Sequence, residues 1–154
     1  MRIGLVAVGK LKERHWRDAA AEYVKRLAPY ARLDVIEVPD RDVTADEARA
    51  LAAEAADVLR ALPPTAHVVA LQPGGRSRTS EEFATWLAEA GLAGRSHVVF
   101  VIGGAAGLHP DVLARADETM SLGAMTFPHQ LARVILLEQV YRAFRIARGE
   151  PYHR

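Results

Sequence analysis

Three glycine-containing segments of this 154-residue chain come at the ends of expected strands and carry the residue types best suited to hold a ligand. They read Leu71-Gln72-Pro73-Gly74-Gly75, Ile102-Gly103-Gly104-Ala105-Ala106-Gly107 and Leu122-Gly123-Ala124-Met125-Thr126-Phe127-Pro128. Small residues let a ligand approach the main chain, whose amide and carbonyl groups can then hydrogen bond to it. None of these segments contains an ionisable side chain. They therefore favour an adenine ring and a thioether over a triphosphate.

Several well-known catalytic motifs are missing from the sequence, which narrows the chemistry. The second segment lacks the G-x-G-x-x-G order of a dinucleotide fingerprint, and no Gly-Lys-Ser/Thr follows it as in a P-loop. The six histidines have neither H-x-x-x-H nor H-E-x-x-H spacing, and there is no cysteine, so no metal site is expected. The absence of G-x-S-x-G disfavours a small α/β hydrolase.

The C-terminal region holds a second group of candidate residues. The segment Leu131–Ile146 is apolar almost all round, which predicts a helix buried in the core or against another subunit. Within it, Glu138 and Arg142 have the spacing of a surface ion pair. The chain then ends Tyr152-His153-Arg154. These three residues are either a frayed terminus or a group that stacks on and hydrogen bonds an RNA base.

The elements that must position these segments alternate between strand and helix. Strands are expected over 2–8, 33–38, 67–71, 97–102 and 118–122, and helices over 13–28, 44–62, 79–90, 110–115 and 128–148. Strands separated by helices predict an α/β fold with a parallel sheet in three layers. The length predicts one domain, residues 1–154. Ligands bind beyond the carboxyl ends of such strands, where all three glycine-containing segments lie.

The charge distribution bears on the partners. The net charge is only +1, with basic ends and an acidic middle. Proteins that hold naked nucleic acid usually have a larger basic excess, so RNA binding is expected to be local or within a larger assembly; solvated helix faces are the plain alternative. No apolar run reaches the length of a membrane span. With no cysteine and no signal peptide, a cytoplasmic protein without membrane partners is expected.

Four motifs spread over the whole chain resemble the ribosomal large-subunit RNA methyltransferase H family. They are Ile3–Lys10, Phe100–Leu108, Ser121–His129 and Glu150–Arg154. The resemblance implies a SPOUT methyltransferase fold with a C-terminal trefoil knot, a rare exception to the rule against threaded connections. It also implies a homodimer that uses S-adenosyl-L-methionine, without a metal, to methylate N3 of a pseudouridine in 23S rRNA on the assembled ribosome.

The resemblance also suggests roles for individual residues. The cofactor site is expected at Leu71, Gln72, Gly103, Gly104, Leu122, Gly123, Ala124, Met125, Thr126, Phe127 and Pro128. His153 is the candidate for proton handling, Arg142 or Arg154 for holding an anionic uracil or phosphate, and Tyr152 for stacking. The alternative function is a non-catalytic RNA- or nucleotide-binding protein of the same knotted fold.

Two mutational expectations accompany these assignments. Valine at Gly103 or Gly104 is expected to intrude on the cofactor while leaving the fold largely intact. Deletion of Tyr152-His153-Arg154 is expected to remove little core packing.

Overall fold

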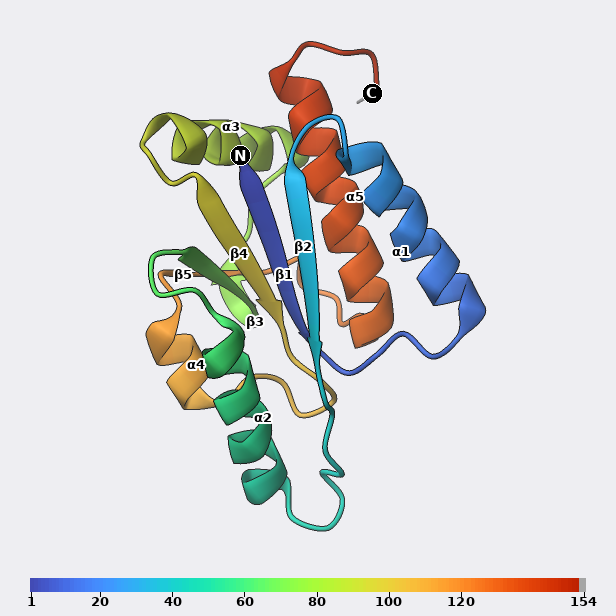
Figure 1. Ribbon diagram of the computed structural model, residues 1–154, viewed down its shortest axis with the longest axis vertical. Coiled ribbons are helices and arrows are strands. Elements are labelled where there is room, and N and C mark those ends of the chain that lie inside the picture. Colours follow the sequence, from blue (N-terminus) through green and yellow to red (C-terminus); the bar gives the residue numbers. More distant parts are fainter. Residues whose placement is uncertain (153–154) are drawn as a thin grey trace.

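Five parallel strands form the central sheet of the protein, whose computed structural model describes residues 1–152. The strand order is β2-β1-β4-β3-β5, and every pairing is parallel (Figure 1). The strands are β1 (Arg2–Val8), β2 (Arg32–Val38), β3 (His67–Arg76), β4 (His97–Ile102) and β5 (Glu118–Met120). This arrangement confirms the predicted α/β class, whereas the trefoil knot and the single domain stay predictions.

Helices cover both faces of the sheet and give the three layers predicted from the sequence (Figure 1). They are α1 (Arg14–Leu27), α2 (Glu47–Ala61), α3 (Ser80–Leu92), α4 (Pro110–Arg115) and α5 (His129–Ala147). The first, third and fifth pack on one face, and the second and fourth on the other. The predicted capping box opens α3, since Thr79 and Glu82 exchange side chain-to-backbone hydrogen bonds there.

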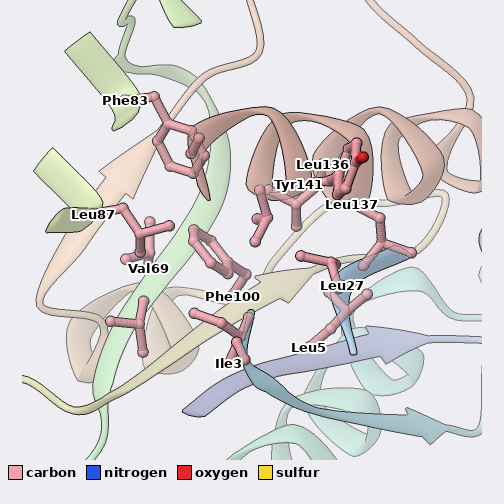
Figure 2. Packing of buried hydrophobic residues seen from close by; sticks show 14 of the residues in the cluster. Ile3, Leu5, Leu27, Val69, Phe83, Leu87, Phe100, Leu136, Leu137 and Tyr141 are labelled. Carbon is pink, nitrogen blue, oxygen red and sulfur yellow. The ribbon is translucent and has the colours of Figure 1, made fainter. Parts of the chain in front are cut away.

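The two cores arise from the alternation of side chains along each strand. In β1, Ile3 and Leu5 face one core while Val6 and Val8 face the other. Figure 2 shows the larger core, in which Phe100 of β4 lies among side chains from α3 and α5. The central strands are buried on both faces, which explains their nearly continuous apolar sequences.

One side of the final helix is buried in the core of its own chain. Helix α5 lies beside α1 and α3 over the larger core (Figure 1). Its buried residues are Arg133, Leu136, Leu137, Val140, Tyr141 and Ala143. The first of the two explanations for its apolar sequence, burial in the core, is therefore confirmed.

Three strand boundaries differ from the prediction, one of them, the start of β2 at Arg32, by a single residue. Strand β3 continues to Arg76, through the predicted turn at Pro73-Gly74-Gly75, because Arg76 pairs with Met120 of β5 after a shift in the register. Strand β5 ends at Met120 rather than at residue 122. The neighbouring order β4-β3-β5 places the carboxyl ends of these three strands together, and the three glycine-containing segments with them.

Candidate functional site

A pocket of about 510 Å³ lies at the carboxyl ends of β3, β4 and β5, beside the first turn of α5. This volume is within the range of roughly 300–1,000 Å³ that is usual for small-molecule sites. Ten of the eleven residues predicted to bind the cofactor line it: Leu71, Gln72, Gly103, Gly104, Leu122, Gly123, Ala124, Met125, Thr126 and Phe127. The eleventh, Pro128, is absent from the lining and is the N-cap residue of α5.

The pocket also has walls that the sequence reasoning missed. Ser77, Met120 and Ser121 contribute from the ends of β3 and β5, and His129 and Ala132 from α5. His129 and Ala132 are three residues apart at the start of the predicted helix and so lie on one face of it, which could have indicated that both line the pocket. The lining contains no Asp, Glu, Lys or Arg, so a ligand there meets mainly apolar side chains and backbone groups, with polar side chains such as Gln72, Thr126 and His129.

Glycine is required in two of these segments because backbone approaches backbone. A Cβ atom on Gly103 would lie 2.5 Å from the carbonyl oxygen of Gly107, and one on Gly75 would lie 2.8 Å from the amide nitrogen of Met120. A Cβ on Gly104 would face Val8 at 3.2 Å. The expectation that valine leaves the fold intact is therefore wrong for Gly103, where the new side chain would meet backbone. At Gly104 it stays a prediction, because the Val8 side chain would have to move by only a few tenths of an ångström to admit a Cβ atom.

The third segment forms a tight turn at the rim of the pocket. The Ser121 amide donates to the Arg76 carbonyl oxygen at 3.0 Å, which ties the segment to β3. Within the turn, Ser121 Oγ donates to the Gly123 carbonyl oxygen at 2.8 Å and accepts from the Gly123 amide at 3.1 Å. Gly123 has φ +129°, a conformation that other residues rarely adopt. Beyond it, Met125 is 81 % exposed.

A polar cluster centred on Glu118 braces the β3–β5 edge beneath the pocket. The Glu118 carboxylate lies 2.6 Å from His67 Nε2 and accepts hydrogen bonds from Arg78 Nη2 at 2.9 Å and Trp86 Nε1 at 3.1 Å. Burial acts to raise the pKa of Glu118, but the bonds from His67 and Arg78 outweigh it and hold that pKa below its usual value. The carboxylate is thus ionised and joins β3, β5 and α3.

The C-terminal candidates form a separate cluster on α5. Arg142 Nη2 donates to Glu138 Oε1 at 2.8 Å, which confirms the predicted ion pair. The Tyr152 hydroxyl donates to the same oxygen at 3.0 Å. Its ring packs edge-to-face against Tyr141 at 5.0 Å, with the Arg142 guanidinium 4.7 Å from its centre. Burial, aided by Glu138, raises the pKa of Tyr152 to about 12.

Two consequences follow for the tail. Tyr152 is anchored, so the expectation that deleting residues 152–154 costs little packing is wrong for this residue. His153 and Arg154, candidates for proton handling and anion binding, lie outside the described residues.

Arg142 follows Ala132 by ten residues, or about 15 Å along a helix. One chain therefore brings the cofactor candidates together, and Arg142 with Tyr152, but holds the two groups apart.

Across residues 1–152, no three His, Asp or Glu side chains gather in a way that could hold a metal ion. No helix in the same range is both long and apolar enough to cross a membrane.

Comparison with known families defines the class of protein. A family model described as "Predicted SPOUT methyltransferase" matches residues 1–153, so the chain is a SPOUT methyltransferase. A protein of Carboxydothermus hydrogenoformans named ribosomal RNA large subunit methyltransferase H is 50 % identical over 159 residues, with both chains covered completely. The chain belongs to the family of that methyltransferase, as its four motifs suggested.

Solved structures give the same fold at low sequence identity. The tRNA (m1G37) methyltransferase of Aquifex aeolicus has a TM-score of 0.59 and 14 % identity, covering 100 % of this chain and 77 % of its own. The SpoU methyltransferase AviRb of Streptomyces viridochromogenes, solved with the cofactor AdoMet, has a TM-score of 0.50 and 14 % identity, covering 97 % of this chain and 59 % of its own. These similarities support the fold assignment.

Proposed function

We propose that this chain transfers a methyl group from S-adenosyl-L-methionine to N3 of a pseudouridine in 23S rRNA, on the assembled ribosome and in the cytoplasm. The observation that carries the proposal is the 50 % identity, along the complete length of both chains, to a protein named as a large-subunit rRNA methyltransferase. The position of the methyl group and the assembled substrate come from the family resemblance. The small net charge of +1 supports a ribosomal substrate, which supplies contacts that bare RNA lacks.

The pocket has properties that fit S-adenosyl-L-methionine. Its loops present backbone groups to a ligand, and its walls are apolar, as the adenosine and thioether parts require. A Cβ atom on Gly123 would have nothing within 4 Å, so the backbone at the rim is open to a ligand. Leu71, Gly103, Leu122 and their neighbours would hold the cofactor.

Methyl transfer of this kind depends on alignment. The cofactor would supply a methyl group bonded to a positively charged sulfur. Attack of the nitrogen on the methyl carbon, in line with the carbon–sulfur bond, would break that bond and release the neutral thioether. The pocket residues bind and orient, and alignment alone can account for several kcal/mol of the barrier. The pseudouridine N3 proton must leave, and Tyr152 is a poor acceptor for it because its pKa is about 12. His153 remains the candidate acceptor in this proposal.

A homodimer would complete the site. The C-terminal cluster and the pocket are about 15 Å apart along α5 in one chain, too far for Arg142 or Tyr152 to touch a base at the pocket. A second copy that sets its C-terminal end beside the pocket would unite the two groups, through an isologous interface. The partly exposed side chains Leu131, Ile135 and Arg142 follow each other along α5 with helical spacing and offer a face for that interface.

Transfer of labelled methyl groups to ribosomes, isolated large subunits and protein-free rRNA tests the proposal. We expect methylation of assembled ribosomes and little of bare rRNA, with the product mapped to N3 of a pseudouridine by mass spectrometry. Ala132→Trp should abolish transfer by filling the pocket. The matched control is Ala52→Trp, on the exposed side of α2. Transfer to none of the three substrates would favour the non-catalytic binding protein, and equal rates on bare rRNA would rule out the assembled substrate.

A further inference from the structure

A smaller pocket of about 200 Å³ opens beside the first one, between the start of α3 and the middle of α5. The two pockets share five lining residues: Ser77, Met120, Ser121, Leu122 and Gly123. A ligand in the first pocket can therefore extend into the second along a continuous wall. The second pocket differs in character because its lining includes a cation, Arg78.

Arg78 is buried and incompletely paired. Its side chain is only 4 % exposed. Nη2 donates to Glu118, and the guanidinium lies 4.9 Å from the centre of the Trp86 ring, so the group is held in place from two sides. Nη1 is buried and has no hydrogen-bond partner within the described part of the chain. An unpaired buried N–H is costly, and a ligand oxygen would remove that cost.

The other walls suit an oxygen-bearing group at the end of a short aliphatic chain. Ser77, Ser80 and Ser121 contribute hydroxyl groups, and Phe83 and Ile135 contribute apolar surface. Ser80 is also the first residue of the 13-residue helix α3, whose N-terminal end favours negative charge. Glu81 and Glu82 share that first turn, and Glu82 is occupied in capping the helix.

We propose that this second pocket binds the α-carboxylate of the cofactor's amino-acid end, with Arg78 as its charged partner. The inference rests on the proposed function, since it extends the cofactor beyond the first pocket. The lining of that first pocket contains no Lys or Arg to pair with the carboxylate. Arg78 lines the second pocket, and an N–H that bonds a carboxylate gives one of the stronger hydrogen bonds in proteins.

Binding measurements with three ligands test the carboxylate site. S-Adenosylhomocysteine carries the whole amino-acid end, decarboxylated S-adenosylmethionine lacks the carboxylate, and 5′-methylthioadenosine lacks the entire end. Calorimetry on the wild-type protein should show binding of S-adenosylhomocysteine that is roughly ten- to a hundredfold tighter than of the two ligands without the carboxylate, the effect of one charge-assisted hydrogen bond.

Variants at Arg78 then assign the preference to one residue. Arg78→Met should reduce the preference for S-adenosylhomocysteine over the two ligands without the carboxylate to about threefold or less. The affinity for 5′-methylthioadenosine should stay unchanged, which would also show that the first pocket is intact. Arg76→Met is the matched control, because Arg76 is exposed and lines neither pocket. Arg78→Gln keeps a neutral hydrogen-bond donor for Glu118 but removes the charge, and it should also weaken the preference if the methionine variant does not fold.

The outcomes separate this inference from the proposed function. An Arg78→Met protein that retains the full preference would overturn the carboxylate site while leaving the cofactor pocket supported. A wild-type protein that binds all three ligands equally would do the same without any variant. A wild-type protein that binds none of them would overturn both the carboxylate site and the cofactor assignment.

Discussion

Replacement of Arg133 tests whether a buried ion pair fixes the α5 wall of the pocket. Arg133 is 3 % exposed and lies one helical turn after His129, which lines the pocket. Its Nη1 donates to Glu37 Oε2 of β2 at 2.5 Å, and its Nη2 donates to the carbonyl oxygen of Gly9, just beyond β1, at 2.8 Å. The start of α5 is thereby tied to the ends of two strands.

The expected loss follows from these contacts. A hydrogen bond to a charged group contributes about 1.5–3 kcal/mol, and the loss of one partner from a fully buried ion pair costs about 3–5 kcal/mol. The Glu37 side chain is 31 % exposed and can be hydrated after the change, so the loss of stability should lie near the lower end of these ranges. Arg133 Nε is buried without a partner among residues 1–152, and its removal offsets part of the loss. We therefore expect Arg133→Met to destabilise the fold by about 2 kcal/mol.

Urea unfolding with linear extrapolation measures this change, and calorimetry with S-adenosylhomocysteine measures its effect on the pocket. Glu37→Gln keeps a neutral acceptor for Arg133 and should cost about 1 kcal/mol, with less effect on binding. Binding to Arg133→Met should weaken because His129 and Ala132 lose their fixed position. If Arg133→Met lowers the free energy of unfolding by less than roughly 0.5 kcal/mol, packing rather than the ion pair holds α5 in place.

Three further predictions concern single groups. Tyr152, whose pKa rises from 10.0 to about 12 on folding, should contribute stability that is complete below pH 10 and lost as the pH rises through 12; an ultraviolet titration should show the high-pH ionisation disappear in Tyr152→Phe. The lowered pKa of Glu118 means that its contribution is present above the ordinary carboxyl range and lost as the pH falls through the lowered value, so Glu118→Gln should flatten the acid limb of a stability–pH curve. Gly103→Ala should lower both the melting temperature and the cofactor affinity, whereas Gly91→Ala, whose new Cβ would meet the flexible end of Met1, should lower neither.

The fold and the pocket could be predicted because both depend on local sequence patterns. Apolar runs and helical spacing define the strands and helices, and the order of parallel strands brings their carboxyl ends together. The end of β3 was misjudged because Pro73-Gly74-Gly75 has turn residues, while the pairing of Arg76 with Met120 is a long-range contact that no local pattern shows. The position of Arg78 also depends on a long-range contact, because its partner Glu118 lies 40 residues further along the chain.

The C-terminal roles were harder to predict for a different reason. The sequence shows that Glu138 and Arg142 can pair, but only the structure shows that Tyr152 joins the same carboxylate and that its ring rests on Tyr141. A residue that looks free to stack on RNA is thus already part of the packing. The knot has no local signature at all, because threading is a property of the path of the whole chain.

Buried ion pairs flank the pocket on two sides and explain how exposed, glycine-containing loops can form a defined site. Glu118 and Arg78 join the β3–β5 edge to α3, and Arg133 joins α5 to the ends of β1 and β2. Rigid elements beneath the loops can fix the binding geometry while the rim stays open. Met125 at that rim is 81 % exposed. The rim of the pocket is therefore open to solvent in one chain, whereas the elements beneath the loops are held by contacts within that chain.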